Sequence, residues 1–130
     1  MEFFAAVACR PAAARLHARL TVADLPCWCA SIERVLADHG ADGEIYTVWG
    51  RFRVHREEIR DGVRFTLPGC PNALAWTVRR DESAGLLVHC TIDRRDPDPD
   101  FVASLQRFVA DWAHGLARLA QDPGEGARAS

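Results

Sequence analysis

The sequence contains no lysine, so all 16 basic residues are arginine. Arginine carries a planar fork of five donors that fits carboxylates and phosphates. The formal net charge is nevertheless −2. A chain without a positive overall field has little means of gathering nucleic acid or an anionic membrane surface, and we expect neither as a partner.

Long apolar runs are also missing, because none approaches the ~20 residues that cross a bilayer. The first nine residues include Glu2 and no basic residue, and their apolar part is short for a signal peptide. We therefore expect a cytoplasmic protein. Its five cysteines are an odd number, which favours reduced thiols packed as small hydrophobic side chains.

The sequence also lacks a glycine-rich phosphate loop, a nucleophile elbow and a zinc-protease motif. Cys27 and Cys29 form a Cys-x-Cys pair, but residues two apart on a helix point about 200° away from each other. Cys27 alone, near a helix start, is a candidate reactive thiol. Cys70-Pro71 matches a dipeptide of haem-responsive proteins, although turn chemistry explains it equally well. We predict no catalytic residue, no metal and no cofactor.

The length of 130 residues suits one domain with one core. We place that domain at 1–121. The remaining segment, 122–130, is rich in glycine and small residues, and we expect it to be disordered.

The first third of the chain gives three predicted elements. The apolar run 2–9 predicts a strand, and the alternation of 14–22 predicts a second one, although its alanines also allow a helix. A helix is expected over 24–40, with Pro26 in its first turn and Gly40 at its end.

Alternating apolar and polar residues then predict four strands, at 44–56, 63–67, 74–79 and 86–93. The turns between them are short, which indicates an antiparallel meander. The most regular pattern follows the acidic cap 96–100. Its apolar residues are spaced 4-3-4-4-3, namely Phe101, Leu105, Phe108, Trp112, Leu116 and Leu119. This spacing predicts a long C-terminal helix that packs on one face of the sheet.

The predicted fold class is thus α+β: an antiparallel meander of five to six strands with one short helix and a long C-terminal helix. This order of elements resembles the helix-grip arrangement of START-type ligand-binding domains, with one or two strands fewer. An alternative is a winged helix-turn-helix formed by 12–20 and 26–39. Its recognition helix would contain Glu33, Asp38 and a single Arg34, a poor set for phosphate contacts.

The sheet face turned away from the helices, which we call the outer face, is the main candidate site. It is expected to collect Arg15, Arg19, Arg51, Arg53, Arg64, Arg79, His17, His55, His89 and Trp49, with only Asp93 opposing them in sign. Of these, the predicted ligand-binding residues are Arg51, Arg53, Arg64, Arg79, His55, His89 and Trp49.

Three interpretations of this face stay open. It is a solvated polar surface, a homodimer interface that buries Trp49 and Leu87, or a site for a small carboxylate or phosphate ligand. We predict a non-catalytic binding or interaction domain that uses this face for self-association or for a small anionic ligand, and we expect a homodimer. The alternative is a helix-grip-like domain that binds a small molecule between sheet and C-terminal helix, with or without enzymatic action. That alternative requires space and polar groups among Tyr46, Trp76, Cys90 and Trp112.

Overall fold

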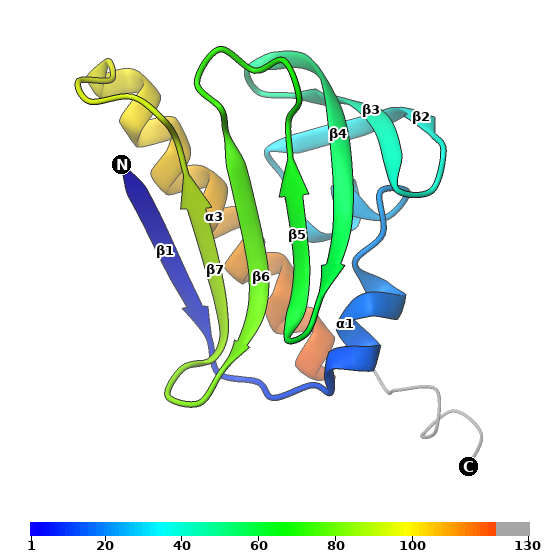
Figure 1. Ribbon diagram of the computed structural model, residues 1–130. Coiled ribbons are helices and arrows are strands. Elements are labelled where there is room, and N and C mark those ends of the chain that lie inside the picture. The colour runs from blue at the N-terminus through cyan, green and yellow to red at the C-terminus, as the bar shows by residue number, and fades with distance from the viewer. Residues whose placement is uncertain (122–130) are drawn as a thin grey trace.

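The computed structural model describes residues 1–121, and the predicted disordered tail at 122–130 lies outside them. The elements along the chain are β1 (Glu2–Val7), α1 (Ala13–Arg19), α2 (Leu25–Trp28), β2 (Ile32–Asp38), β3 (Asp42–Thr47), β4 (Gly50–Ile59), β5 (Gly62–Thr66), β6 (Ala75–Asp81), β7 (Gly85–Thr91) and α3 (Pro99–Gln121). Figure 1 shows the strands side by side with α3 running obliquely behind them.

The strands form one sheet in the order β1-β7-β6-β5-β4-β3-β2, and every neighbouring pair is antiparallel. Strands β2 to β7 are therefore a meander, and β1 completes the sheet beside β7. This arrangement confirms the predicted α+β class, with seven strands in the described chain instead of five or six.

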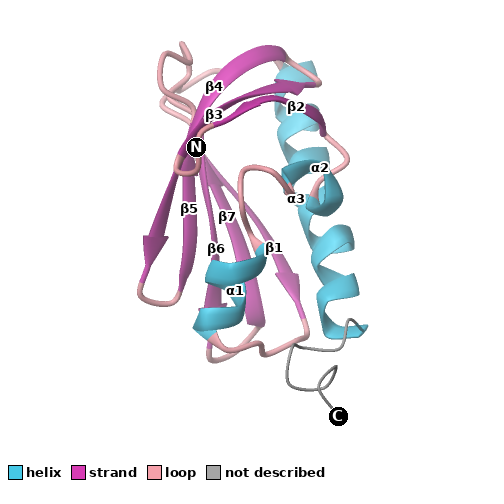
Figure 2. Cartoon of the chain, turned by 90° about the vertical axis from the view of Figure 1, so that its right-hand side faces the viewer, coloured by secondary structure: helices cyan, strands magenta, loops and turns pink. Residues whose placement is uncertain are grey.

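Helix α3 covers one side of the sheet, as the side view in Figure 2 makes clear. Most of its predicted apolar stripe faces inward, because Leu105, Phe108, Trp112, Leu116 and Leu119 are all fully buried. Phe101, at the start of the stripe, is only partly buried and packs against the core. Burying each such side chain stabilises the fold by ~1.5–3 kcal/mol. None of the helices within residues 1–121 is long and apolar enough to cross a membrane.

A glycine on α3 allows α2 to pack closely against it. A Cβ atom added at Gly115 would collide with the carbonyl oxygen of Trp28. The two backbones can approach this closely only because Gly115 has no side chain.

The predicted strand at 14–22 is wrong, because this segment begins with helix α1. Its alanines have high helix propensity, and the buried Leu16 and Leu20 are four residues apart, on one helical face. Arg56 of β4 holds the end of this helix: its guanidinium donates to the carbonyl oxygens of His17 (2.5 Å) and Leu20 (2.6 Å). The alternation of apolar and polar residues in 14–22 therefore also fits a helix with one buried face.

The predicted helix at 24–40 is also wrong. Helix α2 is a single turn that ends at Trp28, and the chain then enters strand β2. Ile32 and Val35 are β-branched and pair with β3, so sheet pairing prevails over a helical spacing of apolar residues. The helix-turn-helix alternative fails with it, because Ile32–Asp38, half of its recognition helix at 26–39, form strand β2.

The predicted strand at 44–56 is a hairpin made of β3 and β4. The turn at Val48–Trp49 is fixed by Thr47, whose hydroxyl donates to the Gly50 carbonyl oxygen (2.9 Å) and accepts from the Trp49 N–H (3.1 Å). Gly50 has φ +112°, a conformation that favours glycine. The alternation of apolar residues continues through the turn, so the sequence pattern does not indicate that the strand is interrupted there.

Candidate functional site on the outer face of the sheet

The outer face is the side of the sheet opposite α3, and strand register defines its members. Six of the seven predicted ligand-binding residues lie there: Arg51, Arg53 and His55 on β4, Arg64 on β5, Arg79 on β6 and His89 on β7. Each alternates with inward side chains of the core, such as Val54, Phe65 and Val88. The alternation in the sequence therefore located these side chains correctly.

Trp49 is the exception, because the β3–β4 turn directs it toward α3. Its ring centroid lies 5.3 Å from that of Phe108 and 6.0 Å from that of Phe101. Its indole N–H donates to the Ser104 hydroxyl (2.8 Å). Arg15, His17 and Arg19 also leave the predicted face, since they lie on α1. Trp49 therefore closes one end of the core instead of lying on the outer face.

Carboxylates accompany the cationic side chains on the outer face. The ion pairs are Arg51 with Glu44, His55 with Asp42 (2.8 Å), Arg79 with Asp81 (3.7 Å) and His89 with Glu2 (2.8 Å). The expectation that Asp93 alone opposes the cations is therefore wrong. Arg53 and Arg64 stand opposite Glu44 and Glu57 in the strand register.

These pairs change the electrostatic character of the face. An exposed ion pair contributes ~0–1 kcal/mol to stability, so the pairs matter less for the fold than for the local field. Because positive and negative groups alternate across neighbouring strands, the face carries no uncompensated block of guanidinium groups. Sequence alternation locates side chains on a face, whereas their partners depend on which strands are neighbours.

Exposed aromatic groups lie among these charges. Phe4 of β1 is 54% exposed and stacks on His89, with ring centroids 4.4 Å apart and planes 8° from parallel. Tyr46 of β3 is also exposed, and the Arg34 guanidinium lies 5.5 Å from its ring centroid. The outer face is thus a mixed surface of ion pairs and aromatic rings. The sequence analysis assigned neither Phe4 nor Tyr46 to it.

The layer between sheet and α3 is filled by aromatic side chains. The ring of Trp76 lies 4.9 Å from Phe108, 5.3 Å from Phe65 and 6.3 Å from Trp112, centroid to centroid. All four residues are buried. The indole N–H groups of Trp76 and Trp112 are buried without an acceptor in the described chain. This interior is thus lined by apolar side chains and contains two indole donors without an acceptor in the described chain.

The cysteines differ in their surroundings. Cys29 and Cys90 are buried, and desolvation raises the pKa of each thiol to about 12, so both are neutral near pH 7. Cys27 is exposed, so the two sulfur atoms of the Cys-x-Cys pair lie in different environments. Within residues 1–121, no three His, Cys, Asp or Glu side chains form a group suited to a metal ion.

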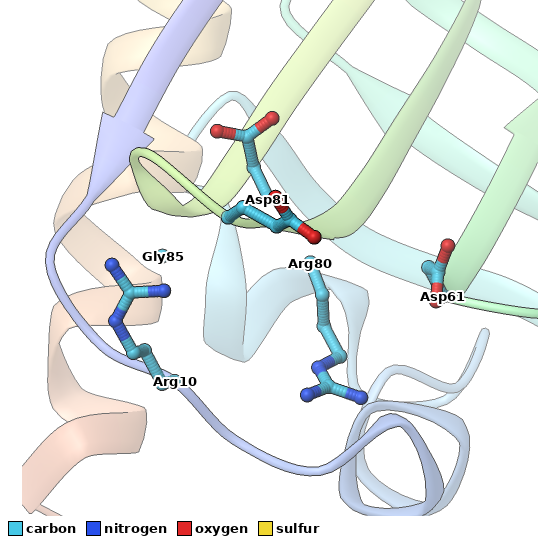
Figure 3. A pocket seen from close by; sticks show the side chains of 6 residues that line it. Arg10, Asp61, Arg80, Asp81 and Gly85 are labelled. Atoms are coloured by element: carbon cyan, nitrogen blue, oxygen red, sulfur yellow. The ribbon is translucent and has the colours of Figure 1, made fainter.

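A polar pocket of about 280 Å³ lies at the end of the sheet where β6 turns into β7. Arg10, Asp61, Arg80, Asp81, Glu82 and Gly85 line it, and Figure 3 shows the Arg10 and Arg80 side chains at its rim. Asp81 accepts from the backbone N–H groups of Ser83 (3.1 Å) and Ala84 (2.8 Å), so it shapes the turn. Two arginines against three acidic residues give this pocket no net attraction for an anion.

Comparison of the chain with protein-family models, with curated proteins and with solved structures gave no match.

Proposed function

We propose that this chain is a non-catalytic interaction domain that associates with a second copy through the exposed surface of its sheet. One observation carries the proposal: the cations of the outer face already have carboxylate neighbours on that face, whereas the ring of Phe4 remains exposed. Aromatic residues and arginine are enriched at protein interfaces.

Because the cations of the outer face already have carboxylate neighbours, this face is less suited to binding a small anionic ligand. A carboxylate or phosphate would have to displace Glu44 from Arg51, or Asp81 from Arg79. It would also enter a field in which acidic side chains alternate with the basic ones. A second protein surface, by contrast, can leave the existing pairs in place and cover the aromatic ring.

Light scattering combined with thermal unfolding tests this proposal. The chain is expected to be dimeric at tens of micromolar, and its melting temperature should change little with millimolar phosphate or citrate. A monomer whose melting temperature rises with these anions would contradict self-association and favour the anion site. Substitution of Trp49 is uninformative here, because Trp49 packs on α3.

A second candidate function is a small-molecule site in the interior. It is favoured by the indole N–H groups of Trp76 and Trp112, because a buried donor without an acceptor is costly. An acceptor on a ligand would reach these N–H groups only if the aromatic rings that fill the layer between sheet and α3 moved apart. Native mass spectrometry of the purified protein distinguishes the candidates: a retained organic molecule that is lost in Trp112→Phe supports the interior site, and the mass of the bare chain opposes it.

A further inference from the structure

Strand β1 is an edge of the sheet, with β7 on one side and no strand of residues 1–121 on the other (Figure 1). The terminal ammonium of Met1 donates to the Ile92 carbonyl oxygen, and the Ile92 N–H donates to the Met1 carbonyl oxygen, at 3.1 Å each. In an antiparallel pair such positions alternate, so Phe3, Ala5 and Val7 bond to β7 in turn. The main-chain N–H and C=O groups of the intervening residues Glu2, Phe4 and Ala6 therefore point away from the sheet.

The two edges of the sheet differ in how they are protected. Strand β2, at the opposite edge, has irregular register at Ile32/Arg34 and at Val35/Ala37, and its sequence carries several charged residues. Bulges and charges are the usual means by which edge strands avoid pairing with other chains. Strand β1 has unbroken register along its whole length and a single charge, Glu2. Strand β1 therefore has neither of these two forms of protection, and α3 packs against the same strand.

We propose that two copies of this chain pair β1 with β1 in antiparallel orientation, with the twofold axis at Phe4. This inference rests on the proposed self-association and names its surface. With the axis at Phe4, this residue faces Phe4 of the second copy, and Glu2 faces Ala6. These are the residues with outward main-chain groups, so each facing pair exchanges two hydrogen bonds.

The side chains fit this register on the outer face. The two Phe4 rings meet at the axis, each backed by the His89 ring of its own copy. Glu2, the only charge on the strand, is already paired with His89 and faces the small Ala6. No like charges stand directly opposite each other, an arrangement that would destabilise the pairing.

The inner side of the strand is equally self-complementary. Phe3 stands opposite Ala5 of the second copy, and the exposed Met1 stands opposite Val7. Large side chains thus face smaller ones, and all four residues are apolar. The pairing joins two sheets into one continuous sheet, with both outer faces on the same side.

Disulfide trapping tests the register. The background carries serine in place of Cys9, Cys27 and Cys70, which are not fully buried. Phe4→Cys should form a disulfide dimer under mild oxidation, because directly facing Cα atoms in a hydrogen-bonded pair are about 5.5 Å apart. Ala6→Cys is the matched control: its two copies would be offset by four positions, roughly 13 Å along the strand, and should stay reduced.

A second design keeps Phe4 intact. An equimolar mixture of Glu2→Cys and Ala6→Cys proteins should give a mixed disulfide, whereas each protein alone should not. Phe4→Lys should raise the dissociation constant of the dimer about tenfold. The substitution removes the aromatic pair at the axis, and it places two lysine side chains opposite each other on the paired edge strands. Val48→Lys is the control, because Val48 is 55% exposed at the β3–β4 turn, far from β1 in the strand order.

The outcomes separate this inference from the proposed function. A wild-type chain that is monomeric at tens of micromolar overturns both. A wild-type dimer that gives no disulfide in either design and resists Phe4→Lys overturns the β1 pairing and leaves self-association through another part of the sheet. A dimer trapped by Phe4→Cys and by the mixture, but not by Ala6→Cys, supports the axis at Phe4.

Discussion

Replacing Trp112 with alanine should destabilise the fold by ~3–5 kcal/mol, because it empties the centre of the layer between α3 and the sheet. Trp112 is fully buried, and its ring centroid lies 6.1 Å from that of Phe65 and 6.3 Å from that of Trp76. Its indole N–H has no acceptor in the described chain, so no hydrogen bond is lost. The expected loss therefore comes from apolar contact and from the cavity.

Two further variants sharpen this prediction. Trp112→Phe keeps most of the ring volume and removes an unsatisfied donor whose burial costs ~1–3 kcal/mol, so its net effect should be below ~1.5 kcal/mol. Arg107→Ala is the control on the same helix: Arg107 is exposed and pairs with Asp111, an i,i+4 contact of ~0.3–0.5 kcal/mol.

Urea unfolding followed by far-ultraviolet circular dichroism measures all three free energies without relying on tryptophan fluorescence. A loss below 1 kcal/mol for Trp112→Ala would refute the packing of α3 described above. So would a Trp112→Phe variant as unstable as the alanine variant, because volume would then not be the cause.

Three more predictions concern stability. Gly115→Ala should destabilise by ~1–3 kcal/mol in urea unfolding although alanine favours helices, because its Cβ would meet the Trp28 carbonyl oxygen; a stabilised variant would contradict the close packing. Arg56→Ala should cost ~1–3 kcal/mol by leaving carbonyl oxygens at the end of α1 without donors, and Arg56→Lys should not restore the loss. The pKa values of Cys29 and Cys90 are raised from 9.0 to about 12, so the folded chain keeps protons that the unfolded chain releases. Stability should fall as pH rises from 9 toward 12, by up to ~1.4 kcal/mol per pH unit for each thiol, and replacing both with alanine should flatten this slope in unfolding curves.

The elements that could be predicted from the sequence are those whose own spacing of apolar residues fits either a helix or a strand, but not both. Helix α3 has a long apolar stripe, and buried residues alternate with more exposed ones along β5, β6 and β7 after the first residue of each strand. The period of each segment therefore indicates its secondary structure. The errors arose where the spacing of apolar residues fits both a strand and a helix. Leu16 and Leu20 suit a strand face and a helix face equally, and tertiary packing selects the helix.

The candidate site was predictable to the same extent. Alternation placed Arg51, Arg64 and their neighbours on the outer face, but the carboxylates beside them come from strands that are adjacent only after folding. The position of Trp49 depended on a turn inside an apparently continuous strand. The open edge at β1 follows from the strand order alone, and no local pattern could have indicated it.

The most direct test of self-association through β1 is the mass in solution of the wild type and of Phe4→Lys, measured by light scattering over a range of concentrations. The account predicts twice the chain mass for the wild type at tens of micromolar. It predicts a shift toward the single-chain mass for Phe4→Lys and no shift for Val48→Lys. A wild type with the mass of one chain throughout this range would contradict it.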